Sequence, residues 1–175
     1  MKLFKNIKKW LENQEHLFYL FLFILIVPNI VLCFTEPLSF IAKVCNVLLP
    51  FGCYYLLMTL SRNCGKMLWI LFLFLFFGAF QIVLLYLFGQ SIIAVDMFLN
   101  LATTNVTEAS ELLNNLWPAI ILVCVIYIPT IVIAAIGCKK RVHLTPVFRK
   151  KMACTGLIIG LVSYGLTFTA TNRNT

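Results

Sequence analysis

The chain has 175 residues, of which 62% are hydrophobic and 11% are charged, and its formal net charge is +8. A soluble domain has about 25% charged residues, so this composition excludes a water-exposed surface around most of the chain. We therefore expect one all-α membrane domain, because a helix pairs its own backbone groups inside lipid. The basic residues flank apolar runs, where lipid headgroups account for them, so nucleic acid is not an expected partner.

Five apolar segments are long enough to cross a bilayer core of about 30 Å, which takes about 20 helical residues. The first follows a basic N-terminal start, but it is longer than a typical signal sequence and lacks a small-residue cleavage motif, so we expect it to be retained. The predicted transmembrane helices cover approximately Leu17–Phe34, Leu38–Leu60, Met67–Phe88, Trp117–Gly137 and Met152–Ala170.

The basic residues also predict the orientation of these helices. Twelve of the fourteen Lys and Arg residues lie in the N-terminal arm, in the loop after the second helix and in the loop after the fourth. These three regions alternate with the others, and the positive-inside rule places them in the cytoplasm. The N-terminus is then cytoplasmic, whereas the C-terminus and the long segment Gly89–Leu116 lie outside.

Two features inside the predicted helices have more than one interpretation. The ammonium of Lys43, in the second helix, can serve an anionic lipid headgroup, or its long stem can simply reach the outer interface, which is the favoured interpretation. In the fifth helix, Gly156-x3-Gly160, followed by Gly165, is a small-residue pattern that lets membrane helices approach one another closely.

The sequence offers little that could carry catalysis. Motifs of soluble enzymes are missing, and no carboxylate lies within a predicted span, although proton-coupled transporters usually carry one there. His16 and His143 lie far apart beside predicted cytoplasmic loops, and the seven cysteines contain no C-x-x-C pair. We therefore expect no catalytic residue and no metal ligand in this chain.

The outer segment 89–116 is the informative part of the sequence, because so long a loop is unusual in so small a protein. Its apolar residues predict two short amphipathic helices on the outer membrane surface. Asn100, Thr104 and Glu108 recur every four residues, so a continuous helix would place them on one face, where they could hold an ammonium-bearing headgroup. Alternatively, Asn105 and Glu108 fit a helix N-cap followed by an acid at the third helical position.

A family resemblance rests on this segment, through the pattern Asn100-x3-Thr104-Asn105-x2-Glu108-Ala109-x-Glu111-Leu112-Leu113. It resembles the membrane domain of bacterial phosphoethanolamine transferases, which include lipid A-modifying and mobile colistin-resistance enzymes. That family has five transmembrane helices, a cytoplasmic N-terminus and this motif between helices three and four. The resemblance implies that Asn100, Thr104 and Glu108 help to bind the donor lipid, phosphatidylethanolamine.

The resemblance covers essentially the whole chain but only half of such an enzyme. It implies a second, periplasmic, sulfatase-like α/β domain, with zinc and a threonine nucleophile, that passes phosphoethanolamine to lipid A or a core sugar at the bacterial inner membrane. We expect this chain to be a truncated product, a gene fragment or an excised domain that is inactive alone, with zinc only in the other half. The alternative is a non-enzymatic small membrane protein, such as a transporter subunit or an assembly factor.

Overall fold

The structure is a computed structural model that describes residues 13–88, 105–139 and 143–172; it leaves the side chains at 87–88, 106–115 and 170–172 undescribed. Within these ranges every regular element is a helix. The helices are α2 (Gln14–Thr35), α3 (Phe40–Leu60), α4 (Cys64–Ile70), α5 (Phe72–Phe88), α7 (Val106–Lys139) and α8 (Pro146–Asn172).

The lengths and surfaces of these helices are those of membrane spans. In the described part of the chain α2, α3, α7 and α8 are each long and apolar enough to cross a bilayer, and α4 with α5 makes a fifth crossing if the pair is one span. Large apolar side chains such as Phe23, Phe76 and Ile121 are more than half exposed, as lipid-facing residues would be. The expectation of an all-α, multi-pass membrane protein is confirmed.

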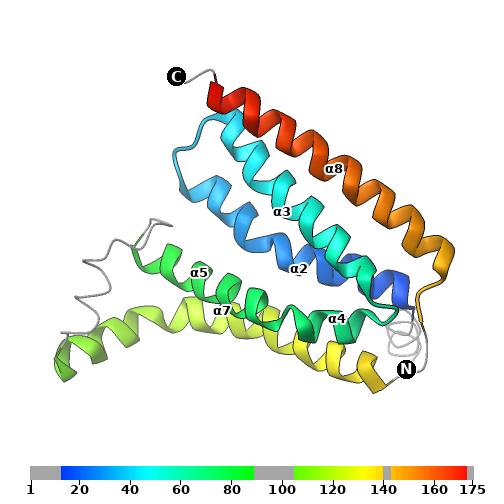
Figure 1. Cartoon of the computed structure of the whole chain (residues 1–175). Coiled ribbons are helices and arrows are strands. Elements are labelled where there is room, and N and C mark those ends of the chain that lie inside the picture. The colour runs from blue at the N-terminus through cyan, green and yellow to red at the C-terminus, as the bar shows by residue number, and fades with distance from the viewer. Residues whose placement is uncertain (1–12, 89–104, 140–142, 173–175) are drawn as a thin grey trace, which may run out of the picture.

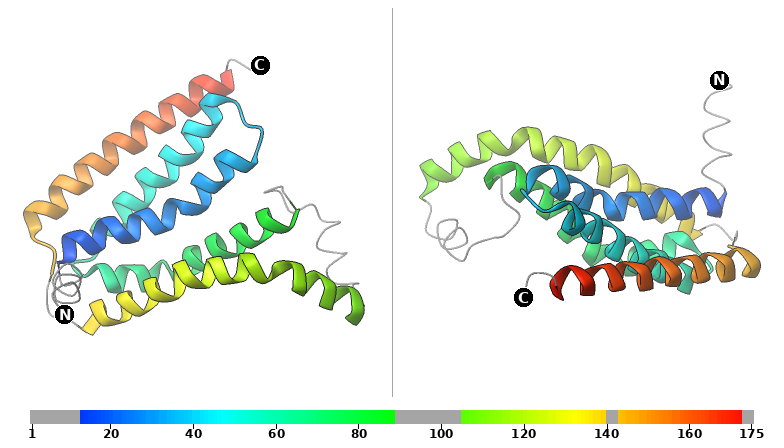
Figure 2. Two further views of the ribbon diagram at one scale, coloured as in Figure 1. Left: turned by 180° about the vertical axis from the view of Figure 1, so that it is seen from behind. Right: turned by 90° about the horizontal axis from the view of Figure 1, so that it is seen from above.

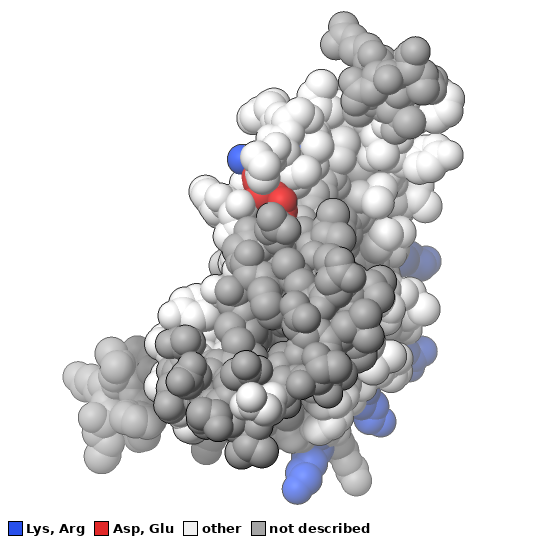
Figure 3. Space-filling model, turned by 90° about the vertical axis from the view of Figure 1, so that its left-hand side faces the viewer, with Lys and Arg blue, Asp and Glu red and all other residues white. Residues whose placement is uncertain are grey.

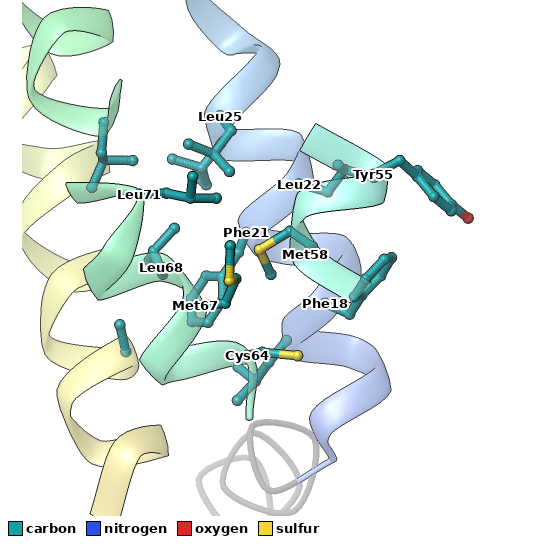
Figure 4. Packing of buried hydrophobic residues seen from close by; sticks show 14 of the residues in the cluster. Phe18, Phe21, Leu22, Leu25, Tyr55, Met58, Cys64, Met67, Leu68 and Leu71 are labelled. Carbon is teal, nitrogen blue, oxygen red and sulfur yellow. The ribbon is translucent and has the colours of Figure 1, made fainter. Parts of the chain in front are cut away.

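The helices form two groups that meet at α2 (Figures 1 and 2). One group contains α2, α3 and α8, and the other contains α4, α5 and α7. The core lies where the groups join, and Figure 4 shows Phe18 and Phe21 of α2 packed near Met58 of α3 and Leu68 of α4. All four side chains are at most 2% exposed, so α2 is the central helix of the bundle.

Glycine residues set the closest approach between α3 and α8. A Cβ atom added to Gly52 would lie 2.9 Å from the backbone nitrogen of Gly160, and one added to Gly156 would lie 3.2 Å from the backbone nitrogen of Leu56. The predicted packing role of Gly156-x3-Gly160 is thus confirmed, with the Gly52 face of α3 as its partner. A Cβ on Gly160 or on Gly165 would meet nothing within 4 Å, so Gly160 takes part only through the backbone atoms that face Gly52, and Gly165 takes no part.

The third predicted helix, Met67–Phe88, differs from the structure because it is interrupted at Leu71. There α4 and α5 meet at a bend of 65°. The segment between Gly65 and Gly78 contains no Pro and no other Gly, so no local signal marks this break. The bend instead serves packing: the backbone at Gly65 touches the backbone of α7, while a Cβ on Gly78 would lie 2.8 Å from Pro28 of α2.

The fourth predicted helix also differs, because α7 begins at Val106 rather than at Trp117. Its 34 residues run about 51 Å at about 1.5 Å each, which exceeds a hydrocarbon core of about 30 Å. The part suited to cross the membrane begins at Leu116, and the preceding part curves away past the other helices (Figure 1). The second expected surface helix is therefore continuous with α7, and the first falls in 89–104, outside the described residues.

Candidate functional site

The three residues predicted to bind a headgroup are only partly within the described structure. Asn100 and Thr104 lie outside the described residues, and Glu108 lies in the first turn of α7 with its side chain undescribed. Asn105 directly precedes α7, so it stands at the N-cap position and Glu108 at the third helical position. Headgroup binding and capping by Glu108 therefore both stay predictions.

The two ends of the bundle are distinct places in the structure (Figure 1). One end holds the α2–α3 turn, the last residues of α5 and α8, and the start of α7; we call it the Lys43 end. The opposite end holds the α3–α4 turn, the last residues of α7 and the start of α8; we call it the Asn63 end. The segment that holds the predicted headgroup residues connects α5 to α7. The end of α5 and the start of α7 both lie at the Lys43 end.

Two amides that were not recognised in the sequence join α2 to α3 inside the span near the Lys43 end. The Nδ2 atom of Asn46 donates to the backbone carbonyl of Asn29 over 3.0 Å, and the Nδ2 atom of Asn29 donates to Oδ1 of Asn46 over 3.4 Å. The thiol of Cys33 donates to the backbone carbonyl of Lys43 over 3.4 Å. Such bonds hold membrane helices together, but a lone Asn in an apolar run does not reveal its partner.

A groove of about 440 Å³ lies between α2 and α3 at this end. Its exposed lining is apolar and comes from Ile30, Cys33, Phe34, Val44, Val47, Leu48 and the stem of Lys43. The sequence marked Lys43 but not the groove, because the groove exists only once the two helices are placed beside each other.

The mouth of the groove carries one positive charge and lies near one negative charge. Lys43 is the only Lys or Arg between Lys9 and Arg62 in the sequence. It lies at the start of α3, whose first turn carries no acidic residue to balance the positive end of the helix dipole. Glu36, in the preceding turn, is the other described charge at this end. Figure 3 shows this end of the molecule, where an acidic patch lies beside one basic side chain and the other basic side chains lie at the margin.

The Asn63 end is held together by side chains that bond to the backbone of other helices. The Nδ2 atom of Asn63 donates to the carbonyl of Gly137 in α7 over 3.0 Å, while its Oδ1 atom caps α4. The backbone N–H of Cys64 donates to Oε1 of Gln14 in α2 over 3.1 Å. Asn63 and Gln14 are each only 2% exposed, so these bonds are shielded from water and tie three helices to one turn.

Arg149 extends this network to α8. Its Nε and Nη2 atoms donate to the carbonyls of Thr59 and Leu60, each over 2.9 Å, and so satisfy the last carbonyls of α3. A hollow of about 290 Å³ lies beside it, between α3 and the start of α8. Because the guanidinium is already bonded, its placement is explained by helix termination, without any ligand.

Among the described residues no group of three His, Cys, Asp or Glu side chains lies close enough to hold a metal ion. Two buried polar atoms in the same residues lack a hydrogen-bond partner, Nε2 of Gln14 and the hydroxyl oxygen of Tyr127. They lie on α2 and α7, away from the groove.

No family model, curated protein or solved structure matches this chain. The fold and the groove define it as a multi-pass, all-helical membrane protein with a lysine at the mouth of an apolar cleft.

Proposed function

We propose that this chain is the membrane domain of a bacterial phosphoethanolamine transferase, located in the inner membrane with its Lys43 end facing the periplasm. The observation that carries the proposal is the place of the Asn100-x3-Thr104-x3-Glu108 pattern. It stands in the segment between the third and fourth crossings of a helical protein whose basic residues predict the same orientation as that family.

In this proposal the chain presents phosphatidylethanolamine, and a periplasmic domain performs the chemistry with its zinc and threonine nucleophile. Glu108 holds the ammonium of the donor headgroup, since a carboxylate attracts a cation more strongly near lipid than in bulk water. Asn100 and Thr104 orient the headgroup by hydrogen bonds. The acceptor is lipid A or a core sugar, which accounts for a role in polymyxin resistance.

The test is Glu108→Gln in this chain joined to the catalytic domain of such an enzyme. If Glu108 holds the ammonium, transfer of phosphoethanolamine to lipid A, measured by mass spectrometry at matched protein level, should fall about tenfold or more, because a charge-assisted hydrogen bond is lost. If Glu108 only caps α7, the variant should be nearly silent, because Gln also serves in a capping box. Glu111→Gln, one turn further along in the same pattern, tests whether Glu111 shares this contact; we expect the smaller effect there.

Two outcomes would contradict the proposal. Full activity of Glu108→Gln would return Glu108 to a capping role. Absence of product from the joined protein with the unaltered chain would favour the alternative of a non-enzymatic membrane protein. The chain expressed alone should add no phosphoethanolamine to lipid A.

A further inference from the structure

The groove between α2 and α3 unites two features that match the two parts of a phospholipid. Its lining is apolar, and its volume is about 440 Å³. Its one basic side chain, Lys43, lies toward the helix termini and lends only its methylene stem to the lining. An acyl chain suits the lining, and a phosphate suits the ammonium.

We propose that this groove binds one glycerophospholipid, with an acyl chain between α2 and α3 and its phosphate at Lys43. The inference does not rest on the proposed function, because it concerns a different place from Asn100, Thr104 and Glu108 and requires no transfer reaction. The sequence named Lys43 as one possible contact for a lipid headgroup, and the structure adds the groove for the acyl chain.

The electrostatic argument for phosphate has two independent parts. Lys43 supplies a full positive charge at the edge of the span, where anionic lipid phosphates are found. The N-terminal turn of α3, capped by Ser39, adds the positive end of its dipole at the same place and carries no acidic residue itself, although Glu36 lies three residues before the cap. A phosphate at the mouth would meet both.

The groove is also held in place by hydrogen bonds. The Asn29 and Asn46 amides bond to each other across α2 and α3, and each is the sequence neighbour of a groove residue, Ile30 or Val47. Cys33 bonds to the carbonyl of Lys43 and ties the base of this side chain to α2. The two helices are therefore joined beside the groove, so a lipid can enter without first separating them.

Snorkelling alone explains less of this arrangement. It accounts for a lysine whose stem lies along apolar surface and whose ammonium reaches the interface. It does not account for an open apolar groove beside that stem, since a snorkelling lysine needs no cleft. The two interpretations differ in what removal of the charge does to lipid binding.

The experiment measures lipid retained by the purified full chain with native mass spectrometry, after addition of phosphatidylglycerol, phosphatidylethanolamine or diacylglycerol. We expect both phospholipids to be retained and the phosphate-free diacylglycerol to be retained much less. Lys43→Met keeps a long apolar side chain but removes the charge. We expect it to weaken the binding of both phospholipids about fivefold. Val47→Trp, which fills the groove, should abolish their binding.

Matched controls separate the groove from general effects on the protein. Lys66→Met removes a charge at the Asn63 end, and Leu49→Trp adds the same ring on α3 outside the groove; both should bind as the unaltered chain does. A phosphatidylglycerol with a diazirine in one acyl chain should crosslink to residues 30–48 of the unaltered chain. This last measurement decides the question even if Val47→Trp does not fold.

Several results would overturn the inference. Equal phospholipid binding by Lys43→Met and the unaltered chain would leave Lys43 as a snorkelling residue only. Equal retention of diacylglycerol would remove the role of phosphate. Crosslinks elsewhere, or a dimer that Val47→Trp converts to a monomer, would mean that other lipids or a second copy of the chain occupy this face.

Discussion

The two ends of the helical bundle are built in different ways. At the Asn63 end, buried side chains bond to the backbones of other helices, and Gly65 brings the backbones of α4 and α7 into contact. At the Lys43 end, hydrogen bonds join α2 to α3, and a groove opens beside them. Close contact between backbones fixes one end, whereas an open apolar groove lies at the other.

A reporter experiment with an all-or-none result tests which end of the bundle faces the periplasm. The distribution of basic residues predicts that the Lys43 end is periplasmic. An alkaline phosphatase reporter fused after Thr175 should be active, and one fused near His143 should be inactive. A fluorescent reporter that matures only in the cytoplasm should give the reverse pattern. The opposite result at either position would exclude the five-crossing orientation.

The next largest effect is expected where α4 meets α7. Gly65→Leu would force a side chain into the backbone of α7, so we expect a loss of about 3 kcal/mol or more in stability. Thermal unfolding in detergent, followed by circular dichroism, measures this loss. Gly165→Ala, where an added Cβ meets nothing within 4 Å, is the control and should unfold at the native temperature or slightly above. Equal stability of the two variants would mean that this contact does not hold the Asn63 end.

A smaller loss of stability is expected when one amide at each end is replaced by alanine. Asn63→Ala removes both a helix cap and a bond to Gly137, and should cost about 1–2 kcal/mol. Asn46→Ala removes only bonds between two membrane helices, and should cost about 0.6 kcal/mol. Steric-trap unfolding in bicelles resolves differences of this size. A greater loss in Asn46→Ala than in Asn63→Ala would reverse the comparison of the two ends.

The sequence predicted most of the helices because their signal is local. About 20 apolar residues suffice to identify a span, so α2, α3 and α8 lie close to their predicted positions. The small-residue pattern at Gly156 and Gly160 is also local in the sequence, and it predicted a close contact with another helix. The break at Leu71 was not predictable, because it depends on how α4 and α5 pack against two other helices rather than on a Pro or Gly at the bend.

The candidate site was less accessible to sequence reasoning. Lys43 was recognised because a charge inside a span is rare. Asn29 and Asn46 were missed, since each is a single amide whose importance appears only when it faces the other across two helices. The groove, likewise, is a property of a helix pair. Asn100 and Thr104 lie outside the described residues, and the side chain of Glu108 is undescribed, so their assignment still rests on the motif.

The packing of α8 has a consequence for how the protein is assembled during translation. Helix α8 is synthesised after the other described helices, and its main partner is α3. Ribosomes add about 5–20 residues per second, so the Gly52 face of α3 would wait on the order of ten seconds for Gly156 and Gly160 to emerge. During that interval lipid, or an insertase, must cover this face. Helix α8 then joins α3 from outside, as a separate docking step rather than as part of an earlier hairpin.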